Sequence, residues 1–345
     1  MRALVLTELG GPDKLAVREV PAPELVRPND VRVRVHAAGL NHLDLFVLDG
    51  LPGISYAFPQ VVGSDAAGII ESVGPAVRDW KVGDRVMVNP GMGCNACGSC
   101  AADDQPLCRQ YALLGEHVPG TAAEFVVVPD TGLARVPDGM PWAQAAGFSL
   151  AALTAWRMLT RRARLKEGET VLIWGIGGGV AQACLQIARL LGARTIVTSS
   201  SDEKLARAAA LGADHGINHA RDDVPRAVRA LTNGENAHVV VDTVGEQSWP
   251  LSLRALGRGG RLVTCGGTSG PMVTTDVRKL FWYQWDLMGS TMGGDREYQA
   301  VARHAFEGRL WPVVDSVVPL AAGAEAFRRM AAGTQFGKLV IEVAP

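Results

Sequence analysis

Four cysteines lie close together in a stretch with few large apolar side chains. Cys94, Cys97, Cys100 and Cys108 follow the spacing Cys-x2-Cys-x2-Cys-x7-Cys within residues 91–111. Four thiolates on one loop can surround a tetrahedral zinc ion and leave no open coordination position. The segment has too little apolar surface for a core of its own, so metal binding would supply folding free energy. The spacing predicts one structural zinc ion per chain, in preference to free thiols or local disulfides.

A glycine-rich turn is the second group of residues that could take part in binding or chemistry. Residues 171–174 are apolar, four of the next five residues are glycine, and apolar residues then recur at helical spacing. Strand, glycine turn and helix form the context of a dinucleotide-binding loop, because glycine lets backbone N–H groups approach a pyrophosphate at a helix N-terminus. The expected cofactor contacts on this turn are Gly175, Gly177, Gly178, Gly179 and Val180.

The elements that must position this turn alternate between strand-like and helix-like patterns. Strand-like runs cover residues 194–198, 216–218, 239–242 and 261–265, and a helical pattern covers 202–211. Such alternation predicts a doubly wound parallel sheet, and therefore a Rossmann domain of the α/β class.

The first 130 residues are instead rich in β-strands and loops. A helical pattern at 143–159 leads into the glycine turn, and 337–343 is typical of a strand that returns to the first domain. The strand-like runs are 3–6, 15–20, 31–37, 61–70, 85–88 and 124–128.

Length and composition limit the class of protein. The chain has 345 residues, 48% of them hydrophobic, 20% charged, and a net charge of −1, which fits a two-domain globular protein. No basic run predicts nucleic-acid binding, and no apolar stretch is long enough to span a membrane. The N-terminus does not resemble a signal peptide, so we expect a cytoplasmic protein that acts on a small-molecule substrate.

Further motifs run through the whole chain and resemble one superfamily. Together with the glycine turn, they are similar to the medium-chain dehydrogenases/reductases, which include zinc alcohol dehydrogenases and quinone oxidoreductases. The resemblance implies a GroES-like domain at 1–150 and 292–345, a Rossmann domain at 151–291, an active-site cleft between them, and a homodimer or homotetramer. The motifs are Gly63-Ser64-Asp65-Ala66-Ala67-Gly68, Val82-Gly83-Asp84-Arg85-Val86, Leu211-Gly212-Ala213 and Gly289-Ser290-Thr291-Met292-Gly293.

The ligands of the catalytic zinc in that family are missing here. The three corresponding positions hold Asn41, Ser64 and Ala146. Three replacements leave no plausible ligand set, so the resemblance argues against a mechanism with a zinc-bound alkoxide.

The segment Gly39-Leu40-Asn41-His42-Leu43-Asp44 resembles the zinc-free quinone oxidoreductase branch, although Phe46 stands where that branch commonly has tyrosine. The expected catalytic residues are Asn41, as a donor to a substrate carbonyl, Asp44, which orients His42 or a water, and His42, as a proton source. Alternatively, Asn41 and Asp44 satisfy backbone groups in a turn, and His42 is a surface or packing residue.

The end of the second Rossmann strand bears on the choice of cofactor. Relatives specific for NAD have an acid there, whereas this chain has Ser199, followed by Ser200 and Lys204. Hydroxyls and an ammonium favour the 2′-phosphate, which predicts NADPH. Alternatively, Ser201 or Asp202 only caps the next helix and Lys204 remains solvated. The resemblance adds as cofactor contacts Thr154, His219, Val244, Gly266, Gly267 and Thr268.

Together these patterns predict an NADPH-dependent reductase without catalytic metal. It would transfer hydride to a quinone or to the β-carbon of an α,β-unsaturated carbonyl compound. The alternatives are an alcohol dehydrogenase that holds zinc through other residues and a non-catalytic NADPH-binding protein. The aromatic run 281–285 lines the cleft, forms a subunit interface or packs in the core.

Overall fold

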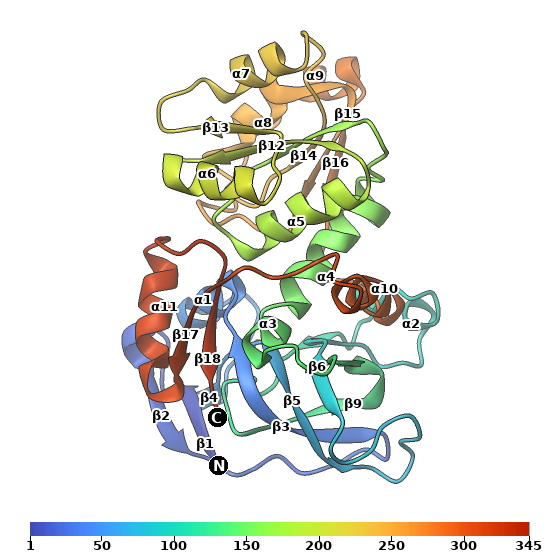
Figure 1. Cartoon of the computed structure of the whole chain (residues 1–345), viewed down its shortest axis with the longest axis vertical. Coiled ribbons are helices and arrows are strands. Elements are labelled where there is room, and N and C mark those ends of the chain that lie inside the picture. Colours follow the sequence, from blue (N-terminus) through green and yellow to red (C-terminus); the bar gives the residue numbers. More distant parts are fainter. Residues whose placement is uncertain (345) are drawn as a thin grey trace. The chain divides into compact units, whose positions relative to one another are not determined.

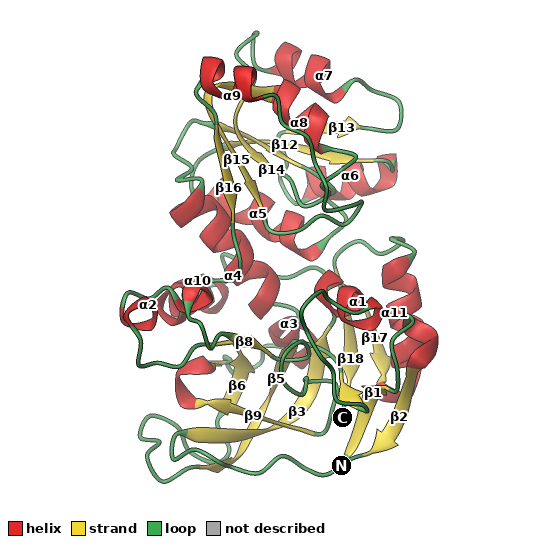
Figure 2. Cartoon of the chain, turned by 180° about the vertical axis from the view of Figure 1, so that it is seen from behind, coloured by secondary structure: helices red, strands yellow, loops and turns green. Residues whose placement is uncertain are grey.

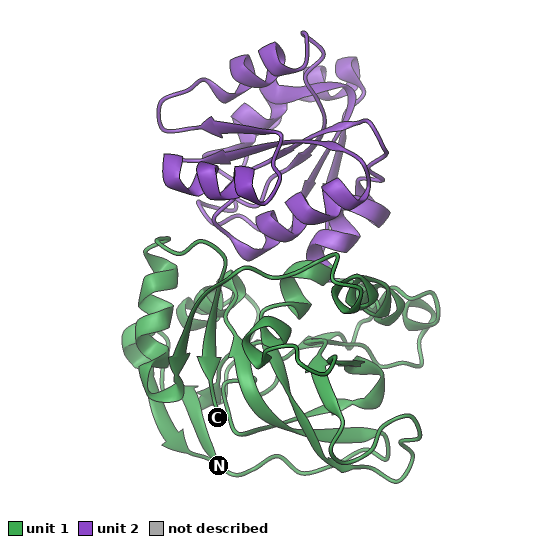
Figure 3. Ribbon diagram, viewed as in Figure 1, with its two compact units in different colours: residues 1–153, 293–345 green, residues 154–292 purple. Residues whose placement is uncertain are grey.

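The computed structural model describes residues 1–344 and divides them into two compact units (Figure 3). The first unit contains Met1–Leu153 and the segment that begins at Gly293, and the second is Thr154–Met292. Both combine helices and parallel or antiparallel sheets, as expected for the α/β class. Within residues 1–344, no helix has the length and apolarity needed to cross a membrane.

Strand β3 (Asp30–Gly39) is the central strand of the first unit (Figure 1). It pairs antiparallel with β5 (Asp65–Val73), β9 (Phe125–Pro129) and β18 (Lys338–Glu342). Gly39 lies opposite both Asp65 and Val340 in the register, so the last residues of β3 meet the first residues of β5 and β18. Polar side chains at these three strand ends are therefore brought together although they are far apart in the sequence.

The alternation along β3 explains why this segment forms a buried strand. Val31, Val33 and Val35 are fully buried, while Arg32 and Arg34 between them are not, which is the period of two expected when one face covers a core. The first unit also contains β1 (Arg2–Leu6), β2 (Leu15–Glu19), β4 (Gln60–Val61), β6 (Arg85–Val88), β7 (Gly91–Met92), β8 (Ala112–Leu113), β10 (Leu133–Arg135), β17 (Val314–Pro319), α1 (His42–Asp49), α2 (Gly98–Ala101), α3 (Trp142–Ala146), α10 (Asp295–Phe306) and α11 (Gly323–Ala331).

The run 61–70, which we expected to be one strand, is broken between β4 and β5. The break is at Gly63, whose φ of +91° is a left-handed conformation that other residues rarely adopt. A Cβ atom there would also lie 2.9 Å from Oγ1 of Thr121. The resulting turn places Ser64 and Asp65 at the start of β5.

The second unit contains six parallel strands in the order β13-β12-β11-β14-β15-β16 (Figure 2). The order reverses between β11 and β14, and ligands of doubly wound sheets bind outside the carboxyl ends of the strands at this switch point. This confirms the predicted Rossmann-type sheet, although β16 was not expected. The strands are β11 (Thr170–Ile173), β12 (Arg194–Ser199), β13 (His215–Asn218), β14 (Ala237–Val241), β15 (Leu256–Thr264) and β16 (Asp286–Gly289).

Helices cover both faces of this sheet (Figures 1 and 2). On one face, Val228 and Leu253 from two helices pack against Leu172, Val240 and Leu262 from the strands. The helices of the unit are α5 (Gly179–Leu190), α6 (Asp202–Ala210), α7 (Val224–Leu231), α8 (Trp249–Ala255) and α9 (Val277–Tyr283), while α4 (Ser149–Arg157) begins in the first unit.

Candidate functional site

The four cysteines of the predicted zinc site are gathered in space. All four Sγ atoms lie within 4.8 Å of one another, and no other group of this kind occurs in the described part of the chain. Sγ of Cys100 is 3.6 Å from that of Cys97 and 3.9 Å from that of Cys94. Ligands about 2.3 Å from a tetrahedral zinc ion are about 3.8 Å apart, so the spacing fits the metal.

The surroundings favour the thiolate, the form that binds metal, at Cys94 and Cys97, whereas burial raises the pKa of Cys100 to about 12. The backbone N–H groups of Cys94 and Gln110 each donate to Sγ of Cys108 at 3.4 Å. The N–H of Ala96 is the main cause that lowers the pKa of Cys94 from its ordinary value. A Cβ atom at Gly93 would lie 2.8 Å from Sγ of Cys100, so this position needs glycine. With four protein ligands, bound zinc would have no open position and would act structurally.

A buried polar network occupies the meeting point of β3, β5 and β18. Asn41 is the N-cap of α1, two residues after the end of β3, Asp65 begins β5, and Lys338 begins β18. The Nζ of Lys338 donates to Oδ1 of Asn41 at 2.5 Å and to Oδ2 of Asp65 at 3.2 Å. Lys338 is 4% exposed and Asp65 is 0% exposed, so this is a buried ion pair with a shared amide. Lys338 was not predicted as a site residue.

Asn41 uses both ends of its amide within this network. Its Nδ2 donates to Oδ2 of Asp65 at 3.0 Å and to the carbonyl oxygen of Gly39 at 3.4 Å, while its Oδ1 accepts from Lys338. The Gly39 contact is long for a hydrogen bond, so one amide hydrogen is only weakly bound. Asn41 remains 7% exposed.

Asp44 lies in the first turn of α1 and is buried. Its two carboxylate oxygens accept from the backbone N–H of Asn41 at 2.7 Å and from Oγ of Ser64 at 3.1 Å. Burial raises its pKa from the ordinary value of 3.8 to about 7, although these bonds and Lys338 oppose the rise. These contacts are those of a residue that stabilises the helix start, and within residues 1–344 the hydrogen bonds of Asp44 go to Asn41 and Ser64, not to His42.

Substitution of Asp44 by asparagine is expected to change how stability depends on pH. Between pH 3.8 and about 7 the folded protein keeps a proton on Asp44 that the unfolded chain releases. The contribution of this carboxyl to the free energy of unfolding therefore falls as pH rises through that window. Denaturant unfolding at several pH values should show a steeper loss in the wild type than in Asp44→Asn, with Asp49→Asn on the same helix as the control. Equal slopes would contradict the raised pKa.

The positions that hold the catalytic zinc in related alcohol dehydrogenases do not fit a metal ion here. Ser64 donates to Asp44, the amide of Asn41 is bound on both sides, and the side chain of Ala146 has no donor atom. The buried ammonium of Lys338 beside Asn41 would also repel a divalent cation. The backbone carbonyl of Ala146 lies close to Gly39, and a Cβ atom added at Gly39 would lie only 2.3 Å from the carbonyl oxygen of Ala146.

His42 lies outside the network at the exposed start of α1. Its ring makes an edge contact with that of Phe46, with 5.0 Å between the ring centres. Partial desolvation lowers the pKa of His42 below its ordinary value, which favours the neutral ring near pH 7. The structure therefore joins Asn41 and Asp44 through the backbone and leaves His42 apart from them.

The glycine turn in the second unit connects β11 to α5. Gly175 has a φ of +68°, and its N–H donates to Oγ1 of Thr198 at 3.2 Å. Helix α5 follows Gly178, which has no side chain to cap it, so the N–H groups of its first turn, including those of Gly179 and Val180, donate to no capping side chain. Such a helix start can bind the pyrophosphate of a dinucleotide.

The residues expected near the adenosine end lie at the carboxyl ends of β12 and β13. Ser199 is buried, and its Oγ accepts from the N–H of Ser201 at 3.1 Å. Ser201 caps α6 by accepting from the N–H of Lys204 at 3.3 Å. Ser200 is exposed, and the N–H of His219 donates to the carbonyl of Ser199 at 3.0 Å. Ser199, Ser200 and His219 thus share one edge of the sheet.

The residues expected near the nicotinamide end lie beyond β14 and β15. Asp242 was not predicted, yet its buried carboxylate accepts from the N–H groups of Val244 and Gly245, each at 3.0 Å, and shapes this turn. The N–H of Thr268 donates to the carbonyl of Thr243 at 3.2 Å, which joins the loop with Gly266 and Gly267 to the same turn. Thr154 lies on α4, with its hydroxyl 3.5 Å from Sδ of Met292.

Comparison with known proteins agrees with this architecture. Residues 27–138 match the alcohol dehydrogenase GroES-like domain, and 179–307 match the zinc-binding dehydrogenase family. The chain therefore belongs to the medium-chain dehydrogenase/reductase superfamily of zinc-type alcohol dehydrogenases and quinone oxidoreductases. It is an oxidoreductase with a GroES-like and a Rossmann-like domain, as the sequence predicted.

Individual relatives span the whole chain. A zinc-type alcohol dehydrogenase-like protein of Schizosaccharomyces pombe is 31% identical, with 99% of each chain covered. A quinone oxidoreductase of Pseudomonas aeruginosa is 32% identical, with 96% of each covered. A solved structure of an NAD-dependent alcohol dehydrogenase is 41% identical, covers 100% of both chains and has a TM-score of 0.96. The similar proteins thus include both alcohol dehydrogenases and a quinone oxidoreductase.

Proposed function

We propose that this chain is an NADPH-dependent reductase that transfers hydride to a quinone or to the β-carbon of an enone without a catalytic metal. The observation that carries the proposal is the closed network of Asn41, Asp65 and Lys338 at the site where related alcohol dehydrogenases hold zinc. A simple ketone would acquire a full alkoxide charge, whereas a conjugated acceptor spreads the charge over an enolate or hydroquinone anion. A few hydrogen-bond donors can stabilise the latter.

Asn41 is the residue of the network best placed to bind the acceptor oxygen. It is buried but retains 7% exposure, and one of its amide hydrogens has only the long contact with Gly39. Lys338 acts as a positioning residue, because its bond to Oδ1 holds the amide and polarises its N–H groups. Bound NADPH would supply the hydride, and water would supply the proton that completes the reduced product; His42, neutral near pH 7, would donate a proton only at lower pH.

The test is the substitution Asn41→Ala. Loss of one donor to a developing oxyanion typically lowers kcat by about 10²–10³-fold. We expect this loss with an enone, with little change in NADPH affinity. The matched control is Asn29→Ala, which removes another amide of the same unit that bonds to Asp130 at 3.2 Å. A folded Asn41→Ala variant with wild-type kcat would contradict the proposed role.

The preference for NADPH over NADH rests on Ser199, Ser200 and Lys204. No acid ends β12 to repel a 2′-phosphate, and Lys204 lies in the first turn of α6. The alternative is NAD, the cofactor named for the solved alcohol dehydrogenase that is 41% identical. We further propose that the protein acts on small molecules as a homodimer or homotetramer, as expected for its family.

Substitution of Lys204 by alanine tests the cofactor assignment. Loss of one charge-assisted bond costs about 1.5–3 kcal/mol, so NADPH should bind about 10–150-fold more weakly while NADH binding is spared. Ser199→Asp should shift the preference toward NADH. Lys166→Ala, at an exposed lysine before β11, serves as the control. Tighter binding of NADH than NADPH by the wild-type protein would refute the assignment.

A further inference from the structure

A large pocket lies in the second unit, away from the glycine turn. Its volume is about 1180 Å³, and its walls come from α7, α8, α9 and the residues around the amino ends of β14 and β15. The glycine turn follows the carboxyl end of β11, which is parallel to β14. The five residues of β14 separate the two edges by about 13 Å. The pocket is therefore distinct from the expected cofactor site.

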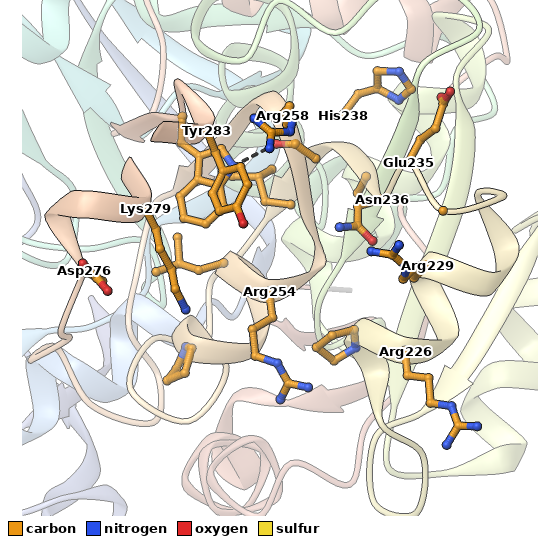
Figure 4. Close-up of a pocket in the computed structure, with 18 of the residues that line it drawn as sticks. Arg226, Arg229, Glu235, Asn236, His238, Arg254, Arg258, Asp276, Lys279 and Tyr283 are labelled. Atoms are coloured by element: carbon orange, nitrogen blue, oxygen red, sulfur yellow. Dashed lines mark hydrogen bonds between the residues drawn. The ribbon is translucent and has the colours of Figure 1, made fainter. Parts of the chain in front are cut away.

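Positive charge dominates the lining of this pocket (Figure 4). Arg254 pairs with Asp223 at 3.3 Å, and the carboxylate of Asp276 pairs with Arg278 at 3.0 Å. The other lining cations are exposed and form no ion pair within residues 1–344, and the two carboxylates of the lining are Glu235 and Asp276. The lining cations are Arg226, Arg229, Arg254, Arg258 and Lys279.

The cations approach the pocket from different elements. Arg226 and Arg229 lie three residues apart on α7, which places them on one face of that helix. Lys279 comes from α9 and lies on the other side of the pocket in Figure 4, and Arg254, from α8, lies between them. Such convergence around a cavity differs from a row of solvated cations on a single helix face.

Two further features favour a bound molecule over solvent. Oδ1 of Asn236, a residue of the lining, is buried and has no hydrogen-bond partner within residues 1–344. The side chains around Tyr283 form a packed part of the wall. Tyr283 stacks on Trp285 with 5.1 Å between the ring centres, and the guanidinium of Arg258 lies 4.8 Å from the centre of the Tyr283 ring. A ligand hydroxyl or amine could satisfy Asn236, and a guanidinium held on a ring is preorganised for an anion.

We propose that this pocket binds a small molecule with two or more phosphate groups. Arginine forks match phosphate oxygens, and cations on three helices can contact separate phosphates of one ligand. The pocket is concave, and its shape and volume suit a small molecule. A nucleic acid would instead need a flatter binding surface. The proposal is independent of the reaction assigned to the first unit.

The experiment is calorimetric titration of the full chain with NADPH present at saturation, so that the cofactor site is filled. The probes are tripolyphosphate, ATP and coenzyme A, with sodium sulfate at matched ionic strength as the reference. We expect one equivalent of a probe to bind per chain in addition to NADPH. Tripolyphosphate tests the phosphate chain alone, and the other two probes test whether an attached nucleoside strengthens binding.

The variant Arg226→Gln/Arg229→Gln should weaken this binding at least about tenfold and leave NADPH affinity unchanged. The control Arg296→Gln/Arg303→Gln removes the same charge from α10 in the first unit and should bind as the wild type does. The proposal is overturned if no probe binds beyond the sulfate reference, if the probes displace NADPH, if both double variants bind equally, or if only an RNA oligonucleotide binds.

Discussion

Substitution of Cys97 by serine is expected to abolish zinc binding and to lower the melting temperature of the protein. The segment around the four cysteines forms only short elements, such as β7, β8 and α2, so the metal would hold it together. Loss of even about 3–5 kcal/mol, a third of what zinc contributes in small peptides, would lower the melting temperature by at least about 5 °C in a protein of this size.

Metal analysis of purified protein measures the first part, and thermal unfolding measures the second. The wild type should contain one zinc ion per chain and Cys97→Ser should contain none. Cys184→Ala, which removes a buried thiol of α5 outside the cluster, is the control for loss of a cysteine. Retention of zinc and of the melting temperature by Cys97→Ser would show that the cluster is not a zinc site. A second zinc ion in the wild type would contradict a metal-free active site.

The parts of the site that could be predicted from the sequence are those made by neighbouring residues. The cysteine cluster spans 15 residues, from Cys94 to Cys108, and the glycine turn lies directly between a strand and a helix. In both, the residue spacing itself determines which groups meet in space. The alternation of strands and helices likewise predicted the parallel sheet of the second unit.

The network around Lys338 could not be predicted in this way. Lys338 and Asn41 are 297 residues apart, and only the pairing of β3 with β18 brings them together. The available signal was a lysine that begins an apolar run, Lys338–Ile341, where a charge is expensive unless it is paired. Asp65, at the start of another apolar strand, carried the same signal.

Strand β16 and the basic pocket were missed for a related reason. β16 is only four residues long and is partly exposed, so its sequence has no strong period. The cations of the pocket are scattered over residues 226–279 and belong to no motif. Their convergence depends on how α7, α8 and α9 lie against the sheet.

In the proposed reaction, hydride would go to a conjugated acceptor whose charge needs no metal. With an enone, hydride would add two electrons and one proton to the β-carbon, the double bond would shift to form an enolate, and one further proton would give the saturated ketone. The amide of Asn41, held by Lys338, would stabilise the enolate oxygen. A saturated ketone would instead form a localised alkoxide, for which this site offers no Lewis acid.

The most direct measurement is the rate of NADPH oxidation with 2-cyclohexen-1-one compared with cyclohexanone, using protein of known zinc content. A difference of about 3 kcal/mol in stabilisation of the transition state corresponds to about 100-fold in rate. We expect kcat/KM to be at least about 100-fold higher for the enone, in protein with one zinc ion per chain, and a chelator should not inhibit promptly. Rapid oxidation of simple alcohols by NADP⁺, abolished by a chelator before the protein unfolds, would contradict the proposed function.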